Sequence, residues 1–249
     1  PCMPVEVDAN QALDVLERYG AIKAGIAPRL ISILRADAAG PRPPSLRTIH
    51  GHGSWTTPRG CRVDHVLLGS NATAVNAAAE AALGLGYDVT VCHANPNATE
   101  TADDVGRCLA REGAALAQAV AADGRPRALI EGGEAVVRLP ADHGVGGRNQ
   151  QTVAAALVVM CGGGQPWPEG LVVASFGTDG EDGPTHAAGG VMDTLVAGRI
   201  ASRRLDACAA VARCDVLPLL EAADGLIVTG PTGTNVADVR ILLAAPAGR

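Results

Sequence analysis

Lysine is almost absent from this sequence. Lys23 is the single lysine in 249 residues, although lysine and arginine together number 20. A Walker-type phosphate loop requires a lysine directly after its glycines, and a Schiff-base mechanism requires one inside the site. Lys23 lies in a segment without other chemically distinctive residues, so the sequence argues against both mechanisms.

Aromatic residues and positive charge are also scarce. The chain contains two Trp, two Tyr and one Phe, and its formal net charge is −6. Without aromatic platforms or a basic run, the surface offers bases nothing to stack on and does not attract nucleic-acid phosphates or anionic lipid. The apolar runs are far shorter than the roughly 20 residues of a membrane span. We therefore expect neither nucleic acid nor a membrane among the partners.

The seven cysteines are scattered and include no Cys-x-x-Cys pair, so no zinc site is expected. Such thiols are typical of a reducing cytoplasm, and the acidic residues near the start argue against a signal peptide. The sequence begins at Pro1, and a helical pattern follows with no preceding strand. From this beginning we expect a carboxy-terminal fragment of a longer protein.

The most distinctive segment that is present runs from Leu171 to Gly189. The apolar stretch Leu171 to Phe176 is typical of a buried strand, and it leads into a loop rich in glycine, carboxylates and hydroxyls. Glycines permit close approach of a ligand to the backbone, and Asp and Thr oxygens can hold a cation or a hydroxyl-rich ligand. In α/β proteins ligands bind at the carboxyl ends of strands, which makes this loop a candidate site.

Three further glycine loops have the same character. Gly146 to Gln150 opens a helical segment, where backbone N–H groups favour anions and Arg148 could add a bidentate contact. Gly230 to Asn235 follows a strand-like segment, and Glu131 to Glu134 links two others. One such loop is weak evidence, but four in about one hundred residues predict a site.

Apolar residues make up 47% of the chain, and apolar runs alternate with helical patterns. This alternation predicts an α/β fold with a largely parallel sheet. The stretch 63–92 is expected to form a βαβ unit in which Asn71 caps the helix. The expected helices cover 12–20, 22–34, 72–85, 102–122, 150–161 and 190–203, and the expected strands cover 63–68, 88–92, 128–130, 135–139, 171–176, 226–229 and 239–243.

The series of glycine loops, in this order, resembles the glycerate 2-kinase family with a MOFRL domain, some members of which are named hydroxypyruvate reductase. The resemblance spans nearly the whole chain and is densest after residue 128. It implies that residues 1–123 are the later part of an amino-terminal Rossmann-like domain. Residues 124–249 would then form a smaller MOFRL-like α/β domain, with the active site in the cleft between the two.

The activity implied by this resemblance is phosphorylation of D-glycerate at its 2-hydroxyl by ATP, assisted by Mg²⁺, to give 2-phosphoglycerate. The partners would thus be a small acid and a nucleotide, and a homodimer is compatible with the sequence. The chain departs from the family in three respects. The family's catalytic lysine lies in sequence upstream of this chain, Gln151 replaces a common acidic residue, and 214–218 replace an Asp-rich aromatic segment.

The resemblance and the residue chemistry together suggest Arg148 and Asp179 as catalytic residues and Asp179 with Asp182 as Mg²⁺ ligands. The other candidates, for substrate or nucleotide binding, are polar or glycine residues of the loops: Ser70, Asn71, Glu131, Gly132, Gly133, Gly146, Gly147, Asn149, Gln150, Thr178, Gly180, Thr185, Gly230, Thr232, Gly233, Thr234 and Asn235. We expect the loops that carry these residues to converge on one cleft.

Structural interpretations stand beside these functional ones. Asp179 and Asp182 could be turn and N-cap aspartates, and the Thr232 loop could be an ordinary tight turn. Arg148 could be a surface residue, although a cation at a helix N-terminus is electrostatically unfavourable.

Two other functions also stay open. A nicotinamide-dependent hydroxypyruvate reductase would need a Gly-x-Gly-x-x-Gly turn, which is absent from the sequence. A sugar-acid or nucleotide-binding module would bind its ligand without turnover.

Overall fold

The computed structural model describes residues 8–40, 52–56, 59–95 and 98–247. The chain separates into two compact units, residues 1–68 and 69–249, and each is described by itself. This division differs from the expected boundary at 123/124. Residue 123 ends a helix inside the second unit, because the helix before it and the strand after it pack on the same sheet. The expected boundary stays a prediction about the family's domains.

The described residues of the first unit form two helices and a two-stranded sheet. Helix α1 (Ala9–Arg18) begins with a capping box in which Asp8 and Gln11 each accept a hydrogen bond from the other's backbone N–H, at 2.9 and 2.8 Å. Helix α2 (Pro28–Ala39) starts at a proline, which fits the first helical turn. Strands β1 (His52–Thr56) and β2 (Arg62–Val66) pair antiparallel. Among the residues that the structure describes, β2 pairs only with β1 and lies in a different sheet from β3, so the predicted βαβ unit over 63–92 is wrong.

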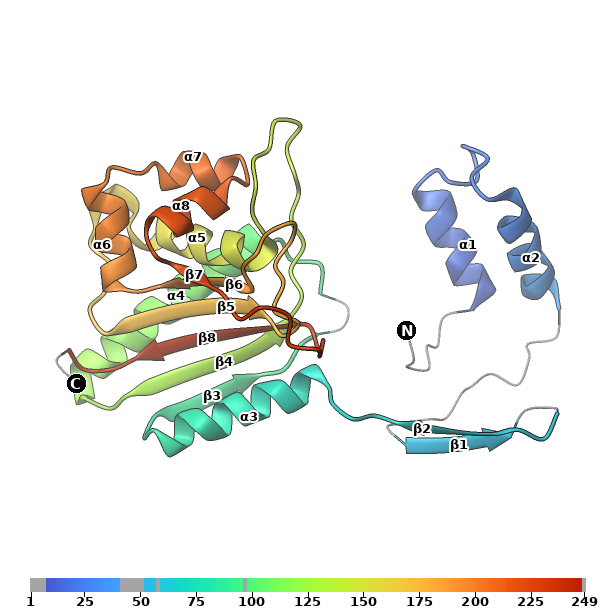
Figure 1. The fold of residues 1–249 in the computed structure, drawn as a ribbon, viewed down its shortest axis with the longest axis horizontal. Helices are drawn as coiled ribbons and strands as arrows, with labels where there is room; N and C mark the ends of the chain where they lie inside the picture. Colours follow the sequence, from blue (N-terminus) through green and yellow to red (C-terminus); the bar gives the residue numbers. More distant parts are fainter. Residues whose placement is uncertain (1–7, 41–51, 57–58, 96–97, 248–249) are drawn as a thin grey trace. The chain divides into compact units, whose positions relative to one another are not determined.

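The second unit is built on a mixed six-stranded sheet (Figure 1). Only its first two strands are parallel, so the expected largely parallel sheet is also wrong. The loop between β5 and β6 contains no crossover helix, and such a connection gives antiparallel neighbours. In spatial order the strands are β3 (Asp88–Cys92), β4 (Arg127–Gly133), β8 (Asp238–Ala244), β5 (Leu171–Gly177), β6 (Gly189–Met192) and β7 (Leu226–Ile227).

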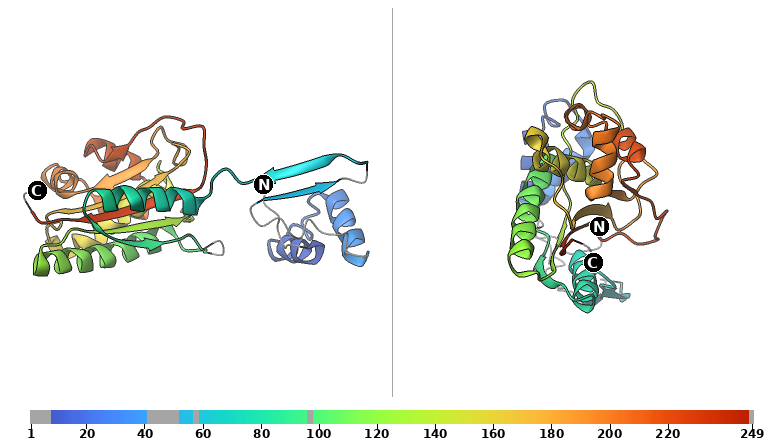
Figure 2. Two further views of the ribbon diagram at one scale, coloured as in Figure 1. Left: turned by 90° about the horizontal axis from the view of Figure 1, so that it is seen from below. Right: turned by 90° about the vertical axis from the view of Figure 1, so that its left-hand side faces the viewer.

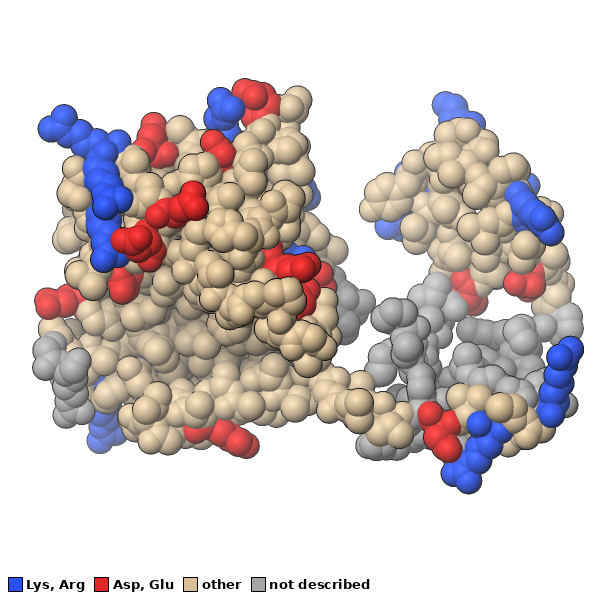
Figure 3. Space-filling model, in the orientation of Figure 1, with Lys and Arg blue, Asp and Glu red and all other residues tan. Residues whose placement is uncertain are grey.

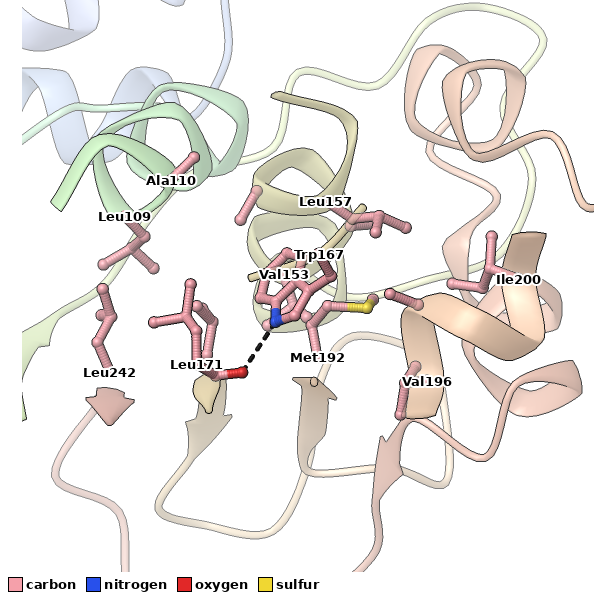
Figure 4. Packing of buried hydrophobic residues seen from close by; sticks show 14 of the residues in the cluster. Leu109, Ala110, Val153, Leu157, Trp167, Leu171, Met192, Val196, Ile200 and Leu242 are labelled. Atoms are coloured by element: carbon pink, nitrogen blue, oxygen red, sulfur yellow. Dashed lines mark hydrogen bonds between the residues drawn. The ribbon is translucent and has the colours of Figure 1, made fainter. Parts of the chain in front are cut away.

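Helices cover both faces of this sheet (Figures 1 and 2). Leu129, Val173 and Leu242 are cross-strand neighbours on one face and pack under α4 (Ala102–Asp123) and α5 (Arg148–Met160). The alternate residues Ile130 and Val239 face α3 (Asn71–Gly84). Three helices complete the larger core shown in Figure 4: α6 (Thr194–Ser202), α7 (Ala207–Ala212) and α8 (Val216–Ala222).

Helices α4 and α5 approach each other closely at Gly106. A Cβ atom at this position would lie 2.7 Å from the Cβ of Ala155. A side chain there would force the two helices apart, so glycine is required at this crossing. The close contact fixes the start of α5 over the sheet, where the candidate residues lie.

Three local expectations differ from the structure. Residues 135–139 form no strand and contribute only an isolated bridge between Val136 and Thr101. The segment 190–203 divides into β6 and α6, and Asp193 caps α6 by accepting a hydrogen bond from Val196 at 2.8 Å. Ser70, not Asn71, is the N-cap of α3. No helix in the described part of the chain is both long enough and apolar enough to cross a membrane.

Candidate functional site

The register of the sheet brings the candidate loops together. Gly133 at the end of β4 and Gly177 at the end of β5 both lie opposite Asp238, the first residue of β8. The loops that leave β4 and β5 and the loop that enters β8 therefore meet at one end of the sheet. In the view of Figure 3, acidic side chains gather at this end.

Hydrogen bonds join the loop after β5 to the loop before β8. The hydroxyl of Thr178 accepts from the backbone N–H of Val236 and donates to the carbonyl of Ala237, both at 2.8 Å. Thr232 donates its hydroxyl to the Thr178 carbonyl at 2.6 Å. Asp179 accepts a hydrogen bond from the side chain of Asn235 at 2.9 Å. The two predicted loops are thus one hydrogen-bonded structure.

Gly180 shows why glycine is needed where these loops touch. Its φ is +86°, in the left-handed region, and a Cβ atom would collide with the carbonyl oxygen of Gly230. The glycine is explained by backbone packing between the loops, without reference to a ligand.

Asp182 occupies the N-terminus of α5. Its carboxylate is 1% exposed and accepts hydrogen bonds from the backbone N–H groups of Asn149 and Gln150 at 3.0 and 2.9 Å. The side-chain amides of the same two residues also donate to it, at 3.2 and 3.1 Å. We predicted that this helix N-terminus would attract a ligand anion, but the protein's own carboxylate fills it. Burial raises the pKa of Asp182, although the four hydrogen bonds act in the opposite direction.

The side chains of Asn149 and Gln150 are turned into the protein. They are 1% and 0% exposed. Ser175 donates a hydrogen bond to Asn149 at 2.5 Å, and Gln150 donates to Thr185 at 3.0 Å. A ligand cannot reach these amides in this arrangement. Their contacts instead hold the start of α5 against β5 and the loop that follows it.

Arg148 is held by two carboxylates. Its Nε and Nη2 donate to the two carboxylate oxygens of Asp238 at 2.7 and 2.9 Å, and its Nη1 lies 3.3 Å from Glu134. The hydrogen bond to Asp238 is the main cause that raises the pKa of Arg148. This pairing explains how a cation is tolerated at a helix N-terminus. It also engages the Nε and Nη2 edge of the guanidinium group, while Nη1 faces the exposed carboxylate of Glu134.

Sequence reasoning missed Asp238. Its side chain is 1% exposed, and it is the bidentate partner of Arg148. The signal in the sequence was a carboxylate that directly begins an apolar strand, where an unpaired charge would be costly.

The two glycines at the end of β4 make room for two polar side chains. A Cβ atom at Gly132 would collide with the amide oxygen of Asn71, whose Nδ2 donates to the carbonyls of Val236 and Asp238, both at 2.9 Å. A Cβ atom at Gly133 would lie 2.8 Å from a guanidinium nitrogen of Arg240. Asn71 therefore ties α3 to the loop before β8, whereas the side chain of Ser70 bonds within its own helical turn.

Glu131 and Arg240 lie opposite each other on β4 and β8. Burial raises the pKa of the Glu131 carboxyl above its ordinary value, although the charge of Arg240 opposes this. Burial likewise lowers the pKa of Arg240, while Glu131 and Asp238 act to raise it. Both groups thus carry a desolvation cost at neutral pH.

Glu131→Gln should change how stability depends on pH. A carboxyl group whose folded-state pKa is raised stabilises the fold below its unfolded pKa, and this contribution is lost as the pH rises through the folded value. The variant should therefore gain stability relative to the unmodified chain as the pH rises above 4.5, the ordinary pKa of Glu131. Urea unfolding of both proteins between pH 4 and pH 7.5 measures this difference. If the difference in unfolding free energy between the two proteins does not change with pH, the raised pKa of Glu131 is contradicted.

A pocket of about 670 Å³ opens beside Arg148. Its size lies in the range of small-molecule sites, which is roughly 300–1,000 Å³. Its polar wall includes Glu134, Arg148 and Gln151, and its apolar wall includes Val136 and Val137. Gly133, Gly146 and Gly147 also line it. Asp179, Thr185, Thr232 and Asn235 belong to the adjoining hydrogen-bonded loops and are not among its lining residues.

No group of three or more His, Cys, Asp and Glu side chains suitable for a metal ion occurs in the part of the chain that the structure describes. Asp182 does not fit as a Mg²⁺ ligand, because both its oxygens already accept two hydrogen bonds from the start of α5. Asp179 is half-buried and fits as one ligand, since Mg²⁺ usually takes one or two carboxylates together with substrate phosphates.

This chain is similar in sequence to proteins named glycerate 2-kinase and putative hydroxypyruvate reductase. Residues 127–238 match the MOFRL family. The D-glycerate 2-kinase of Thermotoga maritima is 41% identical over 117 residues, which are 47% of this chain and 27% of that protein. A putative hydroxypyruvate reductase of Agrobacterium vitis is 36% identical over 119 residues, covering 47% of this chain and 30% of its own length.

Among solved structures, the crystal structure of glycerate kinase from Thermotoga maritima superimposes with a TM-score of 0.71 at 30% sequence identity. The match covers 97% of this chain and 51% of that chain. The chain therefore spans about half the length of this relative. The aligned residues cover a smaller share of the two proteins named above.

Proposed function

Because residues 127–238 match the MOFRL family and the chain is similar to glycerate kinases, we propose that its loops serve the active site of a glycerate 2-kinase. The proposed reaction transfers a phosphoryl group from ATP to the 2-hydroxyl of D-glycerate. The observation that carries the proposal is the guanidinium group of Arg148, held by a bidentate ion pair at the wall of a pocket where the glycine loops meet.

This chemistry suits the residues at hand. Phosphoryl transfer requires mainly positioning of the substrates and stabilisation of charge on the transferred group. Asp238 fixes the plane of the Arg148 guanidinium, so its remaining N–H donors point in a constant direction. A preorganised cation of this kind stabilises charge without having to reorient during the reaction. In this proposal Arg148 is the catalytic residue, and Asp238 positions it.

Asp179 is the second proposed catalytic residue. Its carboxylate is anchored by Asn235 and by the backbone N–H of Glu181, at 2.9 and 3.1 Å. A Mg²⁺ ion bound there with the nucleotide would supply charge neutralisation on the phosphates. Thr178 and Thr232 hold the loop in place through their hydroxyls. The exposed Thr234 and the half-buried Thr185 and Ser70 stay candidates for contacts with the substrates.

An Asp179→Asn variant should need more Mg²⁺ for half-maximal activity and turn over more slowly, while folding normally. The amide preserves the size of the side chain but removes the negative charge that attracts the ion. Titration of activity against Mg²⁺ in both proteins measures the shift. Glu181→Gln is a matched control on the same loop, since Glu181 is exposed and only its backbone bonds to Asp179. Equal Mg²⁺ requirements in all three proteins would remove Asp179 from the proposed site.

A direct assay separates the kinase from a hydroxypyruvate reductase. The longest natural polypeptide that contains this sequence is supplied first with D-glycerate, ATP and Mg²⁺, and then with hydroxypyruvate and NADH or NADPH. We expect ATP consumption that depends on glycerate and no oxidation of the nicotinamide. Robust NADH oxidation by purified protein would overturn the kinase proposal. Ligand binding without either turnover would favour a binding module.

A further inference from the structure

The pocket beside Arg148 is larger and more apolar than the proposed acid substrate requires. Its volume is about 670 Å³, and pockets of this size commonly enclose ligands as large as a drug molecule. D-glycerate is a three-carbon acid without an apolar group. The acid alone would therefore leave much of the pocket, and its apolar side chains in particular, without a ligand contact.

The loop that leaves β4 supplies an apolar wall, which consists of Val136, Val137 and Leu139. All three residues line the pocket. Val136 is 46% exposed and Leu139 is 59% exposed. Single exposed apolar side chains are ordinary, but apolar side chains gathered in a pocket are typical of a ligand site. The apolar wall thus has free surface for an apolar part of a ligand.

Hydrogen bonds hold the apolar wall in place, although its residues form no regular strand. The backbone N–H of Val136 donates to the carbonyl of Glu100 at 3.1 Å, and the carbonyl of Val136 accepts from Ala102 at 2.8 Å. These two bonds tie the wall to the start of α4. A wall that is already fixed loses little freedom when a ligand binds, so less of the binding free energy is lost to ordering.

The polar side chains that line the pocket already interact within the protein. Gln151 directs its amide N–H groups to Asp103 and to a backbone carbonyl, at 2.7 and 2.9 Å, and its oxygen is fully buried. Glu134 lies 3.3 Å from Arg148. Asn95 also has an interaction with the rest of the protein. The pocket therefore offers a ligand apolar contact in preference to side-chain hydrogen bonds.

We propose that the apolar wall binds the base of the nucleotide by its faces. Of the two ligands in the proposed reaction, the nucleotide is the one with a flat, weakly polar part, so this inference rests on the proposed function. A base packs well against apolar side chains. Adenine and guanine differ in the donors and acceptors at their edges, which the wall does not contact. The site should therefore distinguish poorly between ATP and GTP.

Equilibrium titration with ATP, GTP and inorganic tripolyphosphate, each with Mg²⁺, tests this site without requiring turnover. The protein is the longest natural polypeptide that contains this sequence. Tripolyphosphate has the linked phosphates of a nucleotide but no base. We expect ATP and GTP to bind within about threefold of each other, because no edge contact separates them. Tripolyphosphate should bind at least about tenfold more weakly, because the apolar contact is lost.

Val136→Ser separates the contribution of the base from that of the ribose and phosphates. It should weaken binding of ATP and GTP by about fivefold and leave binding of tripolyphosphate unchanged. Val159→Ser is the matched control, since Val159 is a 43% exposed valine on α5 that does not line the pocket. This control should bind all three ligands normally. Leu139→Ser, with the same expected effect, replaces Val136→Ser if that variant does not unfold cooperatively.

Several results would overturn the proposal: no binding of ATP, equal binding of ATP and tripolyphosphate, or a preference for ATP over GTP above about 30-fold, which requires contacts to the base edge. Unchanged ATP binding in the wall variants would also overturn it and would indicate that another part of the polypeptide covers the wall. The kinase proposal is tested separately. Glycerate phosphorylation with ATP binding that does not depend on the wall refutes this inference alone, and wall-dependent ATP binding without glycerate phosphorylation refutes the kinase proposal alone.

Discussion

Arg148→Lys is expected to lower kcat/KM for D-glycerate by about 100-fold, as the removal of one preorganised charge-stabilising group commonly does. Lysine keeps the positive charge, but its ammonium group cannot pair with both oxygens of Asp238 and also present donors in a fixed plane. Asp238→Asn should reduce kcat in the same direction, because it weakens the pairing that orients the guanidinium group. Steady-state kinetics with glycerate as the varied substrate measure both effects.

The matched control for this experiment is Arg213→Lys. Arg213 is an exposed arginine on the same unit, and its ion pair with Asp142 lies outside the pocket. This control should retain normal kinetics. Near-normal kinetics in Arg148→Lys, with folding confirmed by circular dichroism, would show that the Arg148–Asp238 pair is purely structural.

Asp182→Ala is expected to lower the free energy of unfolding by about 3 kcal/mol, more than an ordinary helix cap contributes. The substitution leaves two backbone N–H groups and two side-chain amides without their acceptor at the buried start of α5. Urea unfolding at neutral pH measures the loss.

Asp206→Ala is the matched control for Asp182→Ala. Asp206 is an exposed N-cap whose side chain accepts a hydrogen bond from the backbone N–H of Ala209 at 2.9 Å. Its removal should cost about 1 kcal/mol. Similar losses in the two variants would contradict the structural role assigned to Asp182.

Much of the fold could be predicted from local patterns. The long helix α4 and the strand β8 appear within a few residues of their expected positions, because helical periodicity and apolar runs are local properties. The direction and order of the strands could not be predicted. An apolar run has no direction, so β4 and β8 look the same whether they pair parallel or antiparallel. The pairing of β2 with β1 was not predictable either, because β1 has the sequence His-Gly-Ser-Trp-Thr and is not an apolar run.

The candidate site shows the same division between local and long-range information. The motifs pointed to loops that meet at one end of the sheet, since glycine and polar residues there are chemically conspicuous, but Asp179, Thr185, Thr232 and Asn235 do not line the pocket beside Arg148. The partners of individual side chains were not predictable. Asp182 caps a helix that begins more than 30 residues earlier in the chain, and Asp238 pairs with Arg148 across 90 residues. Arg240 offered one signal that can be read in advance, a charge inside the apolar run Val239 to Leu243.

Phosphorus NMR of the reaction product tests the central proposal most directly. The longest natural polypeptide that contains this sequence is incubated with ATP, Mg²⁺ and D-glycerate, and the position of the new phosphate ester is read from its coupling to the carbon-bound protons. The account predicts 2-phosphoglycerate from the unmodified protein and a rate lower by about two orders of magnitude from Arg148→Lys. Formation of 3-phosphoglycerate, or no phosphate ester from protein shown to be folded, would contradict the proposed kinase function.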